Sequence, residues 1–139
     1  MSSSHKDTDK SLLLNTFNTQ LFEFIEYIQI VLSHDISNFS IKKVKMAFTM
    51  IKKTNPSLVI KIWNNYISAK YETEINNNNI DFFIEKDYKK DLIYLNSSDD
   101  IINNIDSLRE PIRNMSKENQ EKSLEYIKNL CILSKVYME

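Results

Sequence analysis

The 139-residue sequence contains no glycine, whereas an average composition of about 7% would supply roughly ten. Phosphate-binding loops, dinucleotide-binding turns and nucleophile elbows all need glycine, because their backbone takes a positive φ or approaches a ligand without a Cβ in the way. The sequence therefore excludes these sites. Whatever the chain folds into must reverse direction with other residues, among which asparagine best tolerates a positive φ.

Length and composition are typical of one ordinary domain. With 42% hydrophobic residues and a net charge of −1, the chain has enough apolar surface for one core and no overall bias toward nucleic acid or membranes. The polar segment 1–11 predicts a disordered tail, and 12–139 predicts a single helical domain. The single cysteine and the lack of a signal peptide or membrane-spanning run indicate an intracellular protein.

The first predicted helix covers residues 12–33. Apolar residues recur there at spacings of three and four, which form one stripe of a helix: Leu14, Phe17, Leu21, Phe24, Ile25, Ile28 and Leu32. Five further apolar residues widen this surface, namely Leu12, Leu13, Phe22, Tyr27 and Ile30. This is more apolar surface than one face of a small bundle absorbs, so we expect self-association through this helix and a homo-oligomer.

Two helices are predicted in the segment that follows. Ser40 is a suitable N-cap for the first, with a hydrophobic staple between Phe39 and Val44. Asn55-Pro56 predicts its end and the start of the next helix, with Asn55 as cap and proline at the first helical position. The stripe of that second helix includes Trp63, which we expect to be buried rather than exposed for base stacking.

The second half of the chain is also predicted to be helical. Residues 72–79 indicate a fraying helix end and loop, and 80–84 and 92–95 indicate short helical turns rather than strands. Ser98 caps a helix that stops or kinks at Pro111, and Ser116 caps the last helix. The prediction is an all-α, compact bundle of five or six helices. Nine of its core residues are expected to be Phe17, Leu21, Phe24, Ile28, Phe48, Ile62, Trp63, Ile105 and Ile127.

Charge is distributed unevenly along the chain. The segment 36–71 contains seven lysines and no acidic residue, while the rest of the chain carries −8. Four of these lysines fall largely opposite the apolar stripe of their helix: Lys42, Lys45, Lys52 and Lys53. They suit a sequence-independent contact with phosphates or with an acidic partner. A solvated face balanced by the acidic segment 72–100 is the favoured explanation of these lysines.

The remaining chemically versatile residues form no catalytic or metal-binding pattern. His34 is near a helix end, where it suits capping, and Asp35 is its only nearby ligand type. Cys131 lies among apolar residues with no identifiable base, which favours a buried thiol over a nucleophile. We therefore expect no enzyme, no cofactor and no metal site.

Several landmarks resemble a family of short uncharacterised proteins encoded by large DNA viruses of protists. They are the segment 14–25, Asn55-Pro56, Trp63, 80–84 with Lys86-Asp87-Tyr88, Pro111-Ile112 and Asn119-Gln120. In that family a glycine often precedes the Asp-Phe-Phe element, where this chain has Asn79 and Ile80. The resemblance implies a viral protein acting in the host cytoplasm or the virion.

These observations lead to a functional hypothesis and an alternative. The hypothesis is a non-enzymatic viral interaction or structural protein that binds itself or another viral or host protein through helical surfaces. The alternative is a nucleic-acid-associated protein that uses the basic strip of residues 41–61.

Overall fold

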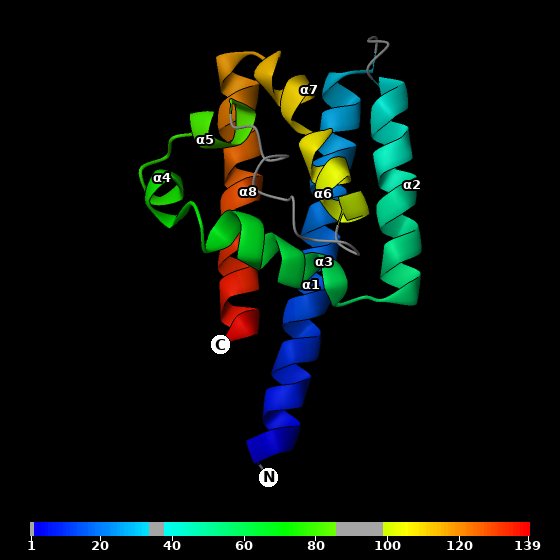
Figure 1. Ribbon diagram of the computed structural model, residues 1–139, viewed down its shortest axis with the longest axis vertical. Helices are drawn as coiled ribbons and strands as arrows, with labels where there is room; N and C mark the ends of the chain where they lie inside the picture. Colours follow the sequence, from blue (N-terminus) through cyan, green and yellow to red (C-terminus); the bar gives the residue numbers. More distant parts are fainter. Residues whose placement is uncertain (1, 34–37, 86–98) are drawn as a thin grey trace.

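The computed structural model describes residues 2–33, 38–85 and 99–139, and within these ranges the chain is helical with short turns and no strand (Figure 1). The predicted all-α class and compact bundle are confirmed. The predicted turn at 92–95, the predicted cap Ser98 and the residues His34 and Asp35 lie outside the described ranges.

Two long antiparallel helices form the body of the fold. α1 (Ser2–Val31) and α8 (Lys117–Met138) lie side by side (Figure 1). The ring of Tyr126 stacks on Phe24 with 5.3 Å between ring centroids, and the Tyr27 hydroxyl donates to Asn119 Oδ1 at 3.0 Å. These contacts join the C-terminal third of α1 to the first half of α8.

α1 begins at Ser2, ten residues before the start that the apolar spacing predicts. Apolar periodicity detects only the part of a helix that packs on a core, and no proline or glycine breaks the helix between residues 2 and 11. The Lys10 ammonium also lies 5.1 Å from the centroid of the Tyr137 ring on α8. The helical conformation therefore extends beyond its apolar stripe.

α2 (Asn38–Thr54) runs antiparallel to α1 on the side away from α8. Its buried residues Ile41, Val44 and Phe48 face the core. The helix begins two residues before Ser40, so the prediction of Ser40 as its cap is wrong. The apolar stripe marks the buried face correctly, but it does not mark the first turn.

α3 (Leu58–Trp63) continues directly into a π-helical turn, η1 (Asn64–Ser68), in which the Ala69 N–H donates to the Asn64 carbonyl at 2.9 Å. α3 starts two residues after Pro56, so the predicted start at Pro56 is wrong. The Asn55 carbonyl instead accepts from the Leu58 N–H at 3.2 Å, which makes residues 55–58 a separate turn.

The asparagine run ends α4 (Glu72–Asn76) in a Schellman motif. Asn78 has φ 58°, its N–H donates to the Ile75 carbonyl at 3.1 Å, and the Asn79 N–H donates to the Glu74 carbonyl at 3.0 Å. Asparagine thus takes the left-handed position that glycine usually occupies. α5 (Asp81–Ile84) follows and confirms a helical turn at this point.

α6 (Asp99–Asp106) and α7 (Arg109–Arg113) lead back to α8. The break falls at residues 107–108 rather than at Pro111, which sits in the first turn of α7, where the missing N–H removes no helical hydrogen bond. Ser116 caps α8 as predicted, because its hydroxyl accepts from the Asn119 N–H at 3.2 Å.

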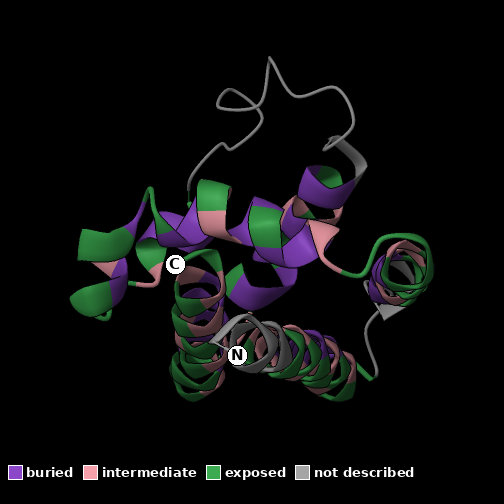
Figure 2. Cartoon of the chain, turned by 90° about the horizontal axis from the view of Figure 1, so that it is seen from below, coloured by how far each residue is buried: buried purple, intermediate pink, exposed green. Residues whose placement is uncertain are grey.

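α8, α1 and α2 stand in a row, and α3, η1, α6 and α7 lie across one side of it (Figure 1). Seen from below, along the axes of the long helices, buried residues gather between these two groups of helices, and exposed residues cover the outside (Figure 2). The core contains all nine residues predicted for it, namely Phe17, Leu21, Phe24, Ile28, Phe48, Ile62, Trp63, Ile105 and Ile127. The outer sides of α2 and α8 are therefore free for other contacts.

Candidate functional site

The exposed side of α2 carries lysines and methionines together. Ile41, Val44 and Phe48 occupy the core side, and Lys42, Lys43 and Met46 between them are exposed. Met46 and Met50, one turn apart, are 68% and 67% exposed. Two exposed large apolar side chains at a spacing of four form a short apolar ridge on this helix.

A hollow of about 450 Å³ lies between this ridge and α1. Its lining comes from both helices and consists of Gln29, Lys42, Lys45, Met46, Thr49 and Met50. We call this surface the α2 groove. It combines methionine side chains, which adapt to different partners, with lysine ammonium groups at its edge.

The four predicted contact lysines divide into two pairs. Lys42 and Lys53 are exposed, as is Lys52, and Lys42 lines the α2 groove. Lys45 and Lys52 lie toward α1. The Lys45 ammonium is 3.2 Å from the Glu26 carboxylate, and the Lys52 ammonium is 5.4 Å from the centroid of the Phe22 ring. Half of the predicted basic strip therefore already contacts groups of the same chain.

The five residues predicted for self-association do not form one patch. Leu12 and Ile30 are exposed but lie eighteen residues apart, about 27 Å along the helix. Leu13, Phe22 and Tyr27 are half-buried. Burial raises the pKa of the Tyr27 hydroxyl, and the neighbouring Tyr126 and Glu118 raise it further. Self-association through α1 stays a prediction, and its two exposed residues, Leu12 and Ile30, are too far apart to form one patch.

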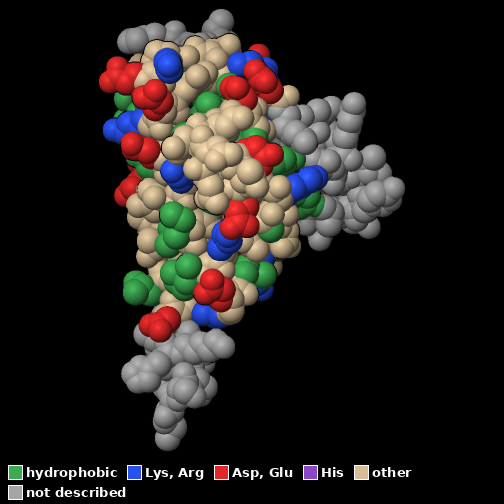
Figure 3. Space-filling model, turned by 90° about the vertical axis from the view of Figure 1, so that its left-hand side faces the viewer, with side chains coloured by type: hydrophobic (Ala, Val, Ile, Leu, Met, Phe, Trp, Pro, Cys, Tyr) green, Lys and Arg blue, Asp and Glu red, His purple; other side chains and the backbone are tan. Residues whose placement is uncertain are grey.

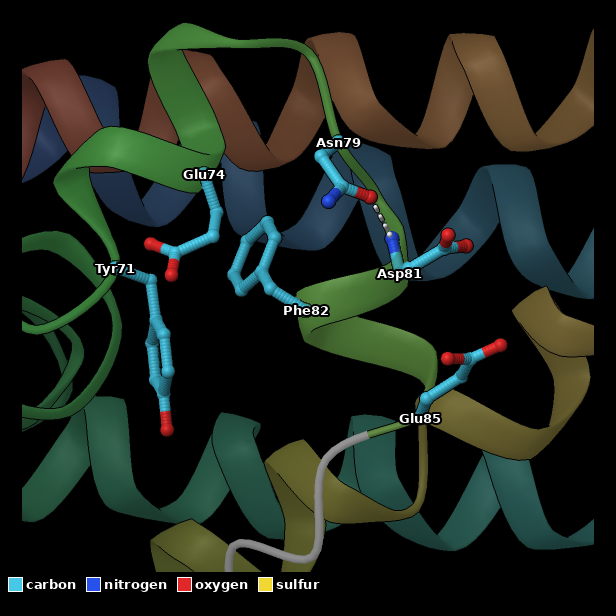
Figure 4. Close-up of a pocket in the computed structure, with 6 residues that line it drawn as sticks. All are labelled: Tyr71, Glu74, Asn79, Asp81, Phe82 and Glu85. Carbon is cyan, nitrogen blue, oxygen red and sulfur yellow. Dashed lines mark hydrogen bonds between the residues drawn. The ribbon is translucent and has the colours of Figure 1, made fainter.

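A second hollow, of about 320 Å³, lies between α4 and α5 (Figure 4). Its residues are Tyr71, Glu74, Asn79, Asp81, Phe82 and Glu85. The Glu74 carboxylate points toward Tyr71, whereas Asp81 and Glu85 point away from it on the far side of α5. Because the three carboxylates do not converge, this hollow does not form a cation site. Across the described residues, no group of three or more potential metal ligands occurs.

Cys131 lies in a buried polar cluster where η1 meets α8. It is 3% exposed, and burial raises the pKa of its thiol, although Ser68, Trp63 and Lys135 offset part of that rise. The hydroxyls of Ser68 and Ser134 lie 2.6 Å apart beside it. The sequence prediction of a buried thiol is confirmed. No carboxylate or imidazole within the described residues hydrogen-bonds to this cluster to serve as a base.

Arg109 is a buried charge that the sequence analysis did not single out. Its guanidinium lies 3.0 Å from the Asp106 carboxylate and 5.5 Å from the Phe83 ring centroid. These contacts tie α6 and α7 to α5. Nothing in the spacing of charges in the sequence distinguishes this pair from exposed ones. Because the Arg109 guanidinium contacts Asp106 and the Phe83 ring, the pair is a packing element rather than a binding site.

Met46 and Met50 are the functional candidates that sequence reasoning missed. Their signal was the spacing of four on the lysine side of α2, opposite the apolar stripe.

None of the described helices combines the length and the apolar content needed to cross a lipid bilayer. No family model, curated protein or solved structure matches the chain. The α2 groove is therefore the feature of the molecule from which a function can be inferred.

Proposed function

We propose that this chain is a non-enzymatic interaction protein that binds another protein surface through the α2 groove. One observation carries the proposal: Met46 and Met50 are each about two-thirds exposed on a helix whose opposite side is fully committed to the core. Exposed apolar ridges with charged residues around them are typical of protein-binding surfaces, because the exposure of apolar side chains to water is unfavourable.

The chemistry of the groove favours a protein over a nucleic acid. Methionine side chains pack against apolar side chains and contribute nothing to phosphate contacts. Of the four lysines that suit phosphates, Lys45 and Lys52 lie against Glu26 and the Phe22 ring on α1. The proposal includes a role in the infected cell or in the virion. The resemblance of the sequence to short proteins of large DNA viruses supports this part of it.

Site-specific photo-crosslinking in the cells that produce the protein tests the proposal. A photo-reactive amino acid replaces Met46 in the full chain, and the lysate is analysed with and without nuclease treatment. The control places the same group at Met138, another exposed methionine, which lies on α8. We expect nuclease-resistant protein crosslinks from position 46 and none from position 138.

Two results would overturn the proposal. One is the absence of crosslinks from position 46. The other is crosslinks that vanish on nuclease treatment, which would assign the groove to nucleic acid instead. A crosslink to a second copy of this chain and a crosslink to a different protein both support the proposal, and peptide mass spectrometry separates the two cases.

A further inference from the structure

Every charged side chain on α2 is a lysine. Two of these lysines continue the methionine ridge at its ends, with Lys42 one turn before Met46 and Lys53 one turn after Met50. Both lysines are exposed, and no carboxylate of the described residues forms an ion pair with either of them. The exposed side of α2 therefore has an apolar centre with an unbalanced positive charge beyond each end.

The opposite side of the molecule, where α4, α5 and α8 lie, differs from α2 in its charges. Acidic and basic side chains are mixed over this face (Figure 3). Ile132 and Val136 form an exposed apolar pair on α8, but Lys128 and Lys135 lie one turn to either side of Ile132. These lysines would face the lysines of α2, so the α8 surface of a second copy is a poor match for the groove.

The lining of the α2 groove favours a partner whose backbone groups are already paired. Its neutral hydrogen-bonding side chains are Gln29 and Thr49, and the Thr49 hydroxyl donates to the Lys45 carbonyl at 2.7 Å. An extended peptide would find few acceptors there for its backbone N–H groups, because lysine ammonium groups only donate. A helix pairs its own backbone groups, and its side-chain rows can interdigitate with a ridge of two residues four apart.

We propose that the occupant of the α2 groove is an acidic amphipathic helix of a different protein, an inference that rests on the proposed function of the groove. Apolar side chains of that helix pack against Met46 and Met50, and its carboxylates lie near Lys42 and Lys53. The two lysines are eleven residues apart, which is about 16 Å along α2. The carboxylates that reach both lysines therefore belong to positions about three turns apart on the partner helix.

The photo-crosslinking experiment tests this inference when the segment attached to position 46 is sequenced. We expect a segment with helical apolar spacing, an excess of acidic residues, and acidic positions about three turns apart on the apolar side. A segment without that spacing or without the acidic excess would overturn the inference and leave the proposed function in place. So would a segment from a second copy of this chain. The absence of protein crosslinks would overturn the proposed function itself, and this inference with it.

Two synthetic helical peptides give an independent test with the full-length protein. Both carry two leucines four residues apart, and they differ only in having glutamates or lysines one turn before and after the leucines. In fluorescence anisotropy titrations at low salt we expect the acidic peptide to bind at least about tenfold more tightly than the basic one. The difference should shrink as salt rises. Equal affinities, or no binding of the acidic peptide, would overturn the inference.

Two double variants locate the binding surface on α2. One carries Met46→Ser and Met50→Ser, and the other carries Lys42→Gln and Lys53→Gln. Each is expected to weaken binding of the acidic peptide about tenfold. All four side chains are exposed, so folding is expected to be retained, and circular dichroism checks it. Affinities equal to that of the wild type would refute the assignment to the α2 groove.

The matched controls change the same residue types on other helices. Met138→Ser removes an exposed methionine of α8, and Lys61→Gln removes an exposed lysine of α3. Both control variants are expected to bind the acidic peptide as tightly as the wild type. A tenfold loss in either control would mean that the peptide responds to the protein's overall composition rather than to the α2 groove, and the inference would fail.

Discussion

Cys131 shows how burial sets the chemistry of a single side chain. Because burial raises the pKa of its thiol, the nucleophilic thiolate is scarce near neutral pH, and the surrounding atoms also block reagents. We expect a thiol reagent such as DTNB to label the native protein slowly and the urea-unfolded protein at once. Rapid complete labelling of the native protein would show that the cluster opens freely.

The same shift predicts how stability depends on pH. The folded thiol binds its proton more tightly than the unfolded one, so its contribution is fully present below the unfolded pKa of about 8.5 and is lost as pH rises beyond it. Between about pH 8 and 10 we expect the free energy of unfolding to fall more steeply for the wild type than for Cys131→Ala. Parallel pH profiles from urea denaturation would contradict this.

Trp63 is the largest fully buried side chain and packs edge-on against Phe17, with 6.3 Å between ring centroids. Replacing it by alanine removes this packing and leaves a cavity, so we expect Trp63→Ala to lower the free energy of unfolding by about 3 to 5 kcal/mol. Trp63→Phe, which retains an aromatic ring, serves as the control and is expected to lose less. Urea denaturation followed by circular dichroism measures both.

At the scale of elements, the Schellman motif after α4 allows a test of how asparagine replaces glycine at a left-handed backbone position. Asn78 has φ 58°, and its side chain accepts a hydrogen bond from the Lys128 ammonium at 2.6 Å. We expect Asn78→Ala to cost about 1 kcal/mol of stability, because alanine is strained in the left-handed region. Asn78→Gly should cost less than alanine.

The neighbouring Asn77 is the matched control for this test. It has φ −85°, so alanine fits its conformation, and Asn77→Ala should change stability by less than about 0.5 kcal/mol. Equal losses at both positions in thermal denaturation would show that the side chains matter here more than the backbone angle.

The sequence predicted elements where the signal is local and missed features that tertiary contacts decide. The Ser116 cap was found because a cap depends on three neighbouring residues. The starts of α2 and α3 were placed wrongly, because Ser40 and Pro56 are acceptable at several positions of a first turn. Spacing along α2 identified its exposed lysines. It could not show that Lys45 and Lys52 lie toward α1, since Glu26 and Phe22 come from a distant part of the sequence.

For the whole molecule, salt dependence separates the two candidate functions of the basic segment. Each phosphate neutralised by a lysine steepens the fall of log affinity with log salt by about 0.9 on duplex DNA. Because Lys45 and Lys52 contact Glu26 and the Phe22 ring on α1, DNA binding through Lys42 and Lys53 alone should show a slope of about −2. Filter-binding or anisotropy titrations measure it.

A slope near −4 would instead mean that Lys45 and Lys52 leave α1 and join the contact. The variant with glutamine at Lys42, Lys45, Lys52 and Lys53 is the control. It should lose binding equally for all nucleic-acid sequences, with little change in stability, because exposed charges contribute little to folding.

The π-helical turn η1 has a consequence for the length of the chain. Such a turn holds one residue more than an α-helix needs, and here the extra residue brings Ser68 round to meet Ser134. Deleting one residue from 64–68 would close the turn into an ordinary α-helix without rotating the residues that follow, because this turn is where the extra residue is absorbed. Tyr71 would then keep its buried place, and the loss would be limited to the contact between Ser68 and Ser134. A deletion within 64–68 should therefore be less damaging than one in the middle of α8, which would rotate every later residue of that helix by about 100°.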